Sequence, residues 1–441
     1  MKASENNGAK SPPAYFLSVT VANIRCFGPR QTLELSDGHN RPRQWTILLG
    51  DNGVGKTTLL QCLAGLQAVE TITSDGKSRF RPQCHRLIFG SFARDRYEAS
   101  LRINAALSVG NKLTNLGHQK SMVKWYVEQG FDSFSSSVVH NNVRGLICYG
   151  YSASRRMGTT DLSEVQTANT TLSLFDDNVP LINAEEWLLQ ADYAAKSLEG
   201  PEQRNAEKRR DRIKDVLIRL LPDVSDLRFA PSRTTPIRTT IQAQTPYGWV
   251  PIMDMSLGYR TLMTWMVDFA SRLFERYPDS PDPLAEPAIA LVDEIDLHLH
   301  PRWQRTLMQF LSETFPNTQF IVSAHSPLVV QAATDANVVL LRREGDHVVI
   351  DNDIKAIQGW RVDQVLTSDL FGLESARPPQ NDAALKERTR LLSKSRLTAK
   401  DKARLRELEA EIGSLPTGET PQDMEAMDVI RRAAELLKKQ E

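Results

Sequence analysis

The sequence predicts an α/β fold in which a mixed sheet is flanked by helices. Its 441 residues are 41% hydrophobic, which is enough to build a large core. Apolar runs at 45–49 and 288–292 are typical of buried strands, and each run ends at a turn rich in glycine or acids. Segments with helical periodicity follow both turns. This order of strand, turn and helix indicates an α/β fold.

Composition argues against several classes of protein. Lys plus Arg and Asp plus Glu each number 54, so no strong net charge directs the chain to nucleic acid or a membrane. No apolar run approaches the roughly 18–20 residues needed to span a bilayer. Residues 1–14 are polar and lack the apolar core of a secretory signal, so we expect a disordered tail there. The four scattered cysteines contain no CxxC pair, which favours a cytoplasmic protein with reduced thiols.

The local patterns predict most of the elements in order. In the N-terminal part we expect two strands over 15–35, a strand over 45–49, a helix over 57–67, and a strand followed by an arginine-containing loop over 146–156. In the middle we expect helices over 182–199 and 205–224, a strand pair over 239–252 and an amphipathic helix over 256–274. Further on we expect strands over 288–292 and 319–324, a helix over 304–315, a hairpin over 337–353 and charged helices over 382–441, with helix starts at Thr398 and Thr420.

Residues 50–57 match the phosphate-binding pattern GxxxxGK[ST] in full. The glycines allow backbone N–H groups to wrap a phosphate, and the following helix N-terminus adds partial positive charge. Lys56 is expected to reach the β- and γ-phosphates, and the Thr57 hydroxyl to bind Mg²⁺. The preceding strand and following helix are the context that this motif, the P-loop, requires. The predicted binding residues are Gly50, Asn52, Gly53, Gly55, Lys56, Thr57 and Thr58.

Two acids follow the apolar strand over 288–292. Asp293 stands where a P-loop protein holds Mg²⁺, and Glu294 can orient and deprotonate an attacking water. His298 and His300 lie nearby and share one face of an extended segment, so a zinc pair is sterically conceivable. Zinc needs a third and usually a fourth ligand, and the neighbouring acids already have a role with magnesium. We therefore favour magnesium.

Two other positions are candidates for the same site. His325 ends a predicted strand one helix and one strand after Glu294, which favours a catalytic over a structural role. Ser256 and Gly258 open a predicted helix, where a hydroxyl, a backbone N–H and the helix dipole can bind phosphate. The alternative for this pair is an ordinary N-cap beside a flexible glycine.

With these four elements in this order, the sequence resembles the ABC-type ATPases of the RecF/SMC-like branch of AAA-family ATPases. That branch includes the ATPase subunits of overcoming-lysogenization-defect-like, Septu-like and retron-associated anti-phage defence systems. The resemblance covers roughly residues 15–65 and 250–345, and DEIDLHLHP at 293–301 matches the Walker B motif and D-loop. It implies ATP hydrolysis by a head-to-tail homodimer, or a higher oligomer, that sandwiches two ATP molecules.

The resemblance also implies roles for single residues. Ser256 and Gly258 would be the signature that contacts the γ-phosphate held by the other protomer. Residues 296–300 would be the D-loop at the dimer interface, and His325 would be the switch histidine. The signature here is SLGYR instead of LSGGQ, which disfavours a membrane transporter and leaves Tyr259 and Arg260 without a role. Gln83 is a Q-loop candidate by position alone. Arg155 and Arg156 either contact phosphate or a partner, or lie in a surface loop; these alternatives stay open.

The expected domain organisation follows from the same matches. Residues 15–90 and 236–375 would form the ATPase head, 91–235 a mainly helical insertion, and 376–441 a charged helical tail. Between positions 377 and 406, ten Lys or Arg stand against three Asp or Glu. This tail either packs on the head, docks a partner protein or binds DNA phosphate.

The chain shows no nuclease motif of its own. The acids at 344–353 lie too close together for a Toprim nuclease and suit the turn and end of a hairpin. With the resemblance, this favours a regulatory or sensor ATPase that controls a separate nuclease or toxic effector, with no membrane involved. The alternative is a RecF-like DNA repair or loading ATPase that acts on DNA directly, although the neutral net charge argues mildly against it. A third possibility is a slow nucleotide switch that scaffolds an assembly.

Overall fold

The computed structural model describes two compact units, Met1–Val365 and Leu366–Glu441. The tail expected over 1–14 lies almost wholly outside the described residues. Among the described residues, none of the helices has the length and apolar character that crossing a bilayer requires. The described residues are 12–72, 78–83, 101–109, 113, 121–129, 134–136, 145–158, 169–231, 239–354, 359–373, 376, 382–394 and 397–413.

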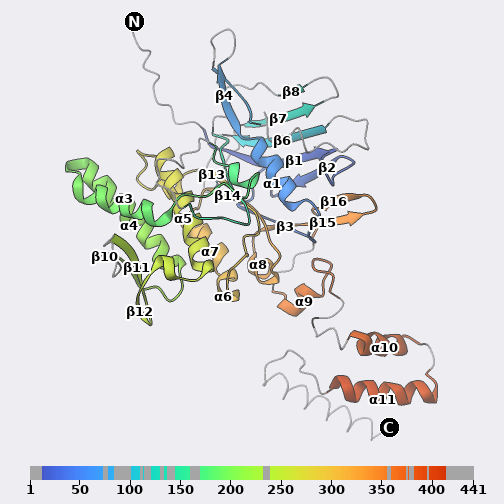
Figure 1. The fold of residues 1–441 in the computed structure, drawn as a ribbon. Helices are drawn as coiled ribbons and strands as arrows, with labels where there is room; N and C mark the ends of the chain where they lie inside the picture. Colours follow the sequence, from blue (N-terminus) through green and yellow to red (C-terminus); the bar gives the residue numbers. More distant parts are fainter. Residues whose placement is uncertain are drawn as a thin grey trace. The chain divides into compact units, whose positions relative to one another are not determined.

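A six-stranded sheet lies at the centre of the first unit, in the order β16-β15-β3-β14-β13-β9. Figure 1 labels β16, β15, β3, β14 and β13 of this sheet. All its neighbouring strands pair in parallel except β16, which pairs antiparallel with β15. The predicted mixed sheet is therefore confirmed, as are the strands expected over 45–49 and 288–292. The strands are β3 (Trp45–Leu49), β9 (Cys148–Tyr151), β13 (Ala288–Val292), β14 (Thr318–Ser323), β15 (Asn337–Glu344) and β16 (His347–Asp351).

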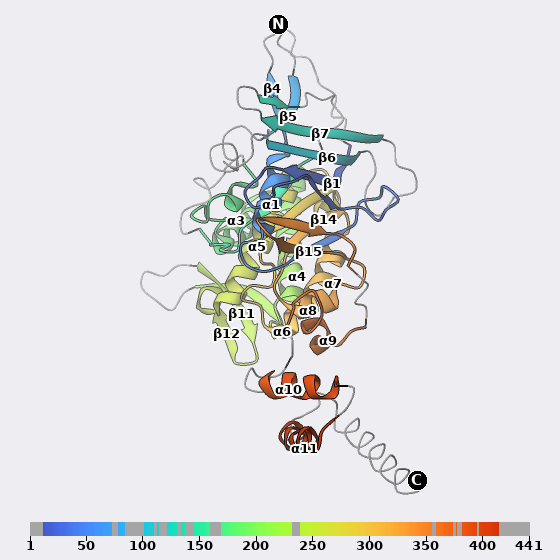
Figure 2. The ribbon, with the colours of Figure 1, turned by 90° about the vertical axis from the view of Figure 1, so that its right-hand side faces the viewer.

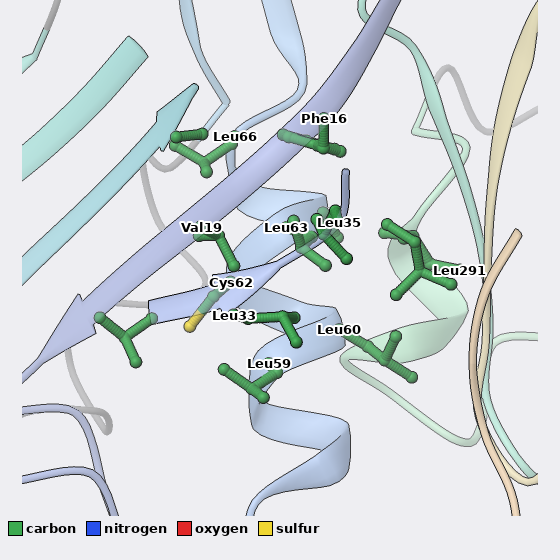
Figure 3. Close-up of a cluster of buried hydrophobic side chains, with 14 of the residues drawn as sticks. Phe16, Val19, Leu33, Leu35, Leu59, Leu60, Cys62, Leu63, Leu66 and Leu291 are labelled. Atoms are coloured by element: carbon green, nitrogen blue, oxygen red, sulfur yellow. The ribbon is translucent and has the colours of Figure 1, made fainter. Parts of the chain in front are cut away.

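One face of this sheet is covered by helix α1 (Lys56–Gly65), which also packs against a second, antiparallel sheet. Figure 2 shows β1, β6 and β7 of the second sheet as neighbours. In the shared core, Leu59 and Leu63 of α1 lie among Phe16 and Val19 of β1 and Leu291 of β13 (Figure 3). The strands of the second sheet are β1 (Ala14–Ala22), β2 (Gln31–Glu34), β6 (Leu101–Val109), β7 (Ser121–Gln129) and β8 (Phe134–Ser136).

The opposite face of the six-stranded sheet packs against helix α5 (Leu257–Arg276). Phe269 of α5 lies 6.5 Å, centroid to centroid, from Phe320 of β14. The next residue, Ile321, belongs to the core on the α1 side, as expected from the alternation of side chains along a strand. The other described strands of the first unit form the hairpin of β4 (Ala68–Ile72) with β5 (Ser78–Pro82) and a three-stranded sheet of β10 (Asp226–Pro231), β11 (Thr239–Thr245) and β12 (Gly248–Pro251). The other described α-helices that lie wholly in this unit are α3 (Ala184–Ser197), α4 (Gly200–Leu220), α6 (Pro301–Gln304), α7 (Leu307–Thr314) and α8 (Pro327–Ala332), and α9 (Val362–Leu366) begins at its end.

The expectation of a mainly helical insertion over 91–235 needs correction in its first part. Apart from Leu113, the described residues between 101 and 136 form the strands β6, β7 and β8. β6 pairs along the whole of β1, about 85 positions earlier in the chain, so its backbone hydrogen bonds are supplied by tertiary pairing that no local pattern reveals. Helices do occupy the later part, as α3 and α4. The helix expected over 304–315 is divided into α6 and α7.

The second unit contains a helical hairpin of α10 (Asp382–Leu392) and α11 (Ala399–Gly413). Leu391 and Leu408 are buried in its core, and Arg404 pairs with Glu387 across the helices at 2.8 Å. At the start of α11, Thr398 and Asp401 exchange hydrogen bonds with each other's backbone N–H, which forms a capping box. The helix start predicted at Thr398 is thereby confirmed. The start predicted at Thr420 lies outside the described residues.

Candidate nucleotide-binding site

The phosphate-binding loop joins β3 to α1 at the carboxyl edge of the central sheet. Gly50, Gly53 and Gly55 have φ values of 133°, 81° and 90°, a region that L-residues rarely adopt. A Cβ added at Gly55 would lie 2.4 Å from Cys26 Sγ, so neither the backbone angle nor the space there admits a side chain. The glycines of the motif therefore permit a tight loop that leads into a helix N-terminus, which is the arrangement that anion binding requires.

Lys56 lies across this loop. Its ammonium donates hydrogen bonds to the carbonyl oxygens of Gly50, at 2.8 Å, and Asp51, at 2.9 Å. The pKa of Lys56 is lowered, chiefly because burial penalises the charged form, while nearby carboxylates led by Asp293 and Glu294 oppose this effect. The lysine is thus a partly desolvated cation held at the loop.

The acids after β13 meet this loop because β3, β14 and β13 run parallel and end at the same edge. The Thr57 hydroxyl donates to Asp293 Oδ2 at 2.6 Å. The hydroxyl of Ser323, the last residue of β14, donates to Asp293 Oδ1 and accepts from Glu294 N at 2.7 Å. Ser323 therefore links the two consecutive acids. Sequence reasoning missed this serine; its position at a strand end, two residues before His325, was the available signal.

The Thr57 hydroxyl and the Asp293 carboxylate fit Mg²⁺, a hard cation that binds one or two protein oxygens and keeps the rest of its shell for phosphate and water. His298 and His300, the histidines weighed for zinc, both have exposed side chains. His300 instead caps α6, because its ring accepts a hydrogen bond from Arg302 N at 3.3 Å. Within the described ranges, no three His, Cys, Asp or Glu side chains gather as a metal site.

Glu294 has a left-handed backbone, with φ of 48°. Its carbonyl oxygen accepts a hydrogen bond from Arg155 Nη2 at 2.8 Å, and its N–H is bound by Ser323. Arg155 is buried and contacts the acidic turn, whereas its neighbour Arg156 has an exposed side chain. The loop after β9 therefore belongs to the site through Arg155.

The segment over 296–300 is held against the strand end that carries His325. The His325 N–H donates to both carboxylate oxygens of Asp296, at 3.1 and 3.3 Å, while the histidine side chain stays exposed. The Ser326 hydroxyl accepts from Leu328 N and caps α8. The structure thus places His325 at the same edge as the two acids.

Ser256 and Gly258 lie at the start of α5. Ser256 is the N-cap residue, but its hydroxyl makes no capping hydrogen bond and its side chain is exposed. A Cβ at Gly258 would lie 2.4 Å from the carbonyl oxygen of His298, so the turn packs closely on the 296–300 segment. Tyr259 has a structural contact, because its hydroxyl donates to Pro222 O at 3.0 Å.

Gln83 and Arg260 complete the residues that were singled out from the sequence. The backbone N–H of Gln83 donates to Gln67 O at 2.8 Å. The Gln83 side-chain oxygen and Arg260 Nε are buried. Among the described residues, neither atom has a hydrogen-bond partner.

Comparison with known proteins agrees with this geometry. The protein family described as "AAA domain, putative AbiEii toxin, Type IV TA system" matches residues 176–331, which include Ser256, Asp293, Glu294 and His325. The "Septu protein PtuA" of Bacillus mycoides (strain KBAB4) is 27% identical over 355 residues, covering 79% of this chain and 43% of that protein. The "Retron Ec83 probable ATPase" of Escherichia coli is 29% identical over 221 residues, covering 50% of this chain and 37% of that protein.

The chain thus spans less than half the length of these relatives. Among solved structures, the SMC head domain from Thermotoga maritima aligns with a TM-score of 0.41 and 14% identity, covering 77% of this chain and 99% of that one. The family match and the named relatives support the same identification as the phosphate-binding loop and the acids after β13. Residues 176–331 of this chain therefore match a AAA-domain family, and the chain is similar in sequence to the Septu PtuA protein and to a retron ATPase.

Proposed function

We propose that this protein binds ATP with Mg²⁺, hydrolyses the ATP, and regulates a separate nuclease or toxic effector in an anti-phage defence system. The observation that carries the proposal is the 2.6 Å hydrogen bond between Thr57 and Asp293, which brings both expected magnesium ligands to the phosphate-binding loop. Glu294 follows Asp293 directly, so an acid able to act as a general base is next to the metal ligands.

Each residue of this cluster has a distinct role in the proposal. The backbone N–H groups of 50–57 and the Lys56 ammonium bind and neutralise the phosphates. Thr57 and Asp293 hold Mg²⁺, which when bound offsets the charge of the β- and γ-phosphates. Glu294 accepts a proton from the attacking water, and His325, at the end of the neighbouring strand, contacts the γ-phosphate side of the site.

The proposal includes an ATP-sandwich homodimer. Ser256 has an exposed, uncapped hydroxyl at a helix N-terminus, where a phosphate of a second protomer is able to dock. Leu257 and Met253 beside it are 52% and 37% exposed, and a partner would cover these apolar side chains. The close contact of Gly258 with His298 supports a single interface formed by the signature turn and residues 296–300.

The defence role rests on the relatives, whose names refer to Septu and retron systems. The chain covers less than half of each, so the effector, the trigger and the role of the α10–α11 hairpin are parts of the proposal. The basic stretch at 377–406 makes this hairpin the proposed docking site for the effector.

The first test is ATP-driven dimerisation. Light scattering of Glu294→Gln with Mg²⁺ and ATP should give twice the mass obtained with ADP, and Lys56→Ala should remain at the ADP value. An unchanged mass with ATP would contradict the sandwich.

The second test addresses the partner. Tagged wild-type protein and Glu294→Gln would be recovered from nuclease-treated native host lysate and examined by mass spectrometry. A stoichiometric protein with nuclease or toxin motifs supports the defence proposal. Recovery of the ATPase alone, together with DNA binding by the ATP-trapped variant, would favour a DNA repair or loading ATPase instead.

A further inference from the structure

Arg155 is a buried cation whose hydrogen bond goes to a main-chain carbonyl and not to a carboxylate. The side chain is only 4% exposed, and Nη2 lies 2.8 Å from Glu294 O. Its Nε is also buried, and the described residues supply no hydrogen-bond partner for it. Burial lowers the pKa of Arg155 to about 10, and three carboxylates oppose this effect, those of Asp296, Asp293 and Glu294. Burying a charge with so few partners is costly, so fold stability alone gives little reason for an arginine here.

The carbonyl that Arg155 binds belongs to a residue with an unusual backbone. Glu294 has φ of 48° and Arg155 has φ of 36°, both in the left-handed region that L-residues rarely adopt. Such conformations persist only where surrounding contacts enforce them. Arg155 binds the carbonyl of Glu294, and Ser323 binds its N–H at 2.7 Å. The two contacts hold the peptide groups on both sides of the Glu294 Cα, and thereby fix the direction of its side chain.

The same arginine also contacts helix α5, which begins directly after Ser256. The guanidinium carbon lies 5.9 Å from the ring centroid of Trp265, on α5. Four residues before Arg155, the hydroxyl of Tyr151 donates to the fully buried Asp268 of α5 at 3.0 Å. The strand end and loop that carry Arg155 are therefore attached to α5 at two points.

We propose that Arg155 is a positioning residue for ATP hydrolysis, which holds Glu294 in its left-handed conformation and connects it to α5, the helix that begins after Ser256. This inference rests on the proposed function. In a dimer, a phosphate bound at Ser256 displaces the N-terminus of α5. The contact of Trp265 with Arg155 transmits this displacement to Glu294. Arg155 thereby makes hydrolysis depend on docking of the second protomer.

The test compares three variants of the full chain: Arg155→Gln, Arg155→Lys and, as a matched control, Arg156→Gln at the exposed neighbouring arginine. Steady-state hydrolysis, binding of a fluorescent ATP analogue and thermal unfolding would be measured for each. Arg155→Gln should lower kcat by about 10²-fold, the usual effect of misplacing a reacting group by about 1 Å, with KM and analogue affinity unchanged. Arg155→Lys should recover part of the loss because it keeps the charge but not the planar fork. Arg156→Gln should behave as wild type.

A double-variant cycle with Glu294→Gln separates positioning from an independent role. If Arg155 acts through Glu294, adding Arg155→Gln to Glu294→Gln lowers hydrolysis no further. Multiplicative losses would overturn the proposal, as would wild-type kcat in Arg155→Gln. A parallel fall in melting temperature, analogue affinity and kcat, with no recovery in Arg155→Lys, would also overturn it, because it would indicate a merely structural residue. Absence of hydrolysis by the wild-type chain would contradict the proposed function itself. This result differs from the failures above, in which the wild-type chain hydrolyses ATP.

Discussion

The hydroxyl of Thr57 lies 2.6 Å from Asp293 Oδ2, although 236 positions separate the two residues. The contact exists because Thr57 lies in the first turn of α1, which follows β3, and Asp293 directly follows β13. Both strands point to one edge of the sheet, with β14 between them. The two oxygen groups that we propose as Mg²⁺ ligands are thereby placed beside the phosphate-binding loop. The dependence of activity on magnesium should follow from this pair.

Replacing Thr57 by alanine should weaken the response to magnesium. The change removes one oxygen of the pair, and we expect the Mg²⁺ concentration for half-maximal hydrolysis to rise by about 10–100-fold, the usual effect of perturbing a metal site. Thr57→Ser keeps the hydroxyl and is the control; it should titrate as wild type. Superimposable Mg²⁺ titrations for Thr57→Ala and Thr57→Ser would remove Thr57 from the metal site.

The variant Glu294→Gln should bind ATP as wild type does but hydrolyse it about 10²–10⁴-fold more slowly. The amide keeps the size of the side chain but cannot accept the proton of water. A loss of this size is usual when a general base is removed. Single-turnover hydrolysis and equilibrium ATP binding would be measured in parallel. Glu313→Gln, at an exposed glutamate of α7 that pairs with Arg219, is the control. Near-normal turnover by Glu294→Gln would exclude this residue as the base.

A methyl group at Gly258 should prevent the dimer without abolishing ATP binding. The added Cβ would lie 2.4 Å from the His298 carbonyl oxygen, so either the start of α5 or the 296–300 segment has to move. We expect Gly258→Ala to bind ATP and to remain at the mass of the ADP state in light scattering with Mg²⁺ and ATP. Normal ATP-driven dimerisation of this variant would argue against an interface at this turn.

Removing the carboxylate of Asp268 should destabilise the fold strongly. Asp268 is fully buried on α5, pairs with Arg272 at 2.8 Å and accepts the Tyr151 hydroxyl. Breaking one side of a buried ion pair leaves the other charge unpaired, so Asp268→Ala should cost about 3–5 kcal/mol in urea unfolding. Asp211→Ala breaks a surface pair with Arg210 and should change stability little. Equal losses for both aspartates would contradict this account.

Local patterns predicted much of the secondary structure correctly. The strand over 45–49, the strand over 288–292 and the helix start at Thr398 depend on neighbouring residues, through apolar runs and a capping side chain. The strands β6 to β8 were not predicted. β6 pairs along β1, which is far away in the chain, and β7 and β8 extend the same sheet, each pairing with the strand before it. Pairing of this kind leaves no regular pattern within the strand itself.

The sequence by itself determined the chemistry available to this protein, since the spacing of 50–57 and the acids after an apolar strand require only adjacent residues. The tertiary structure alone decided how these groups are held. Ser323 links Asp293 to Glu294, and Arg155 is buried against Glu294, because parallel strands from distant parts of the chain end at one edge. Hydrogen bonds between residues far apart in sequence depend on that packing, so the conformation of Glu294 was visible only in the fold.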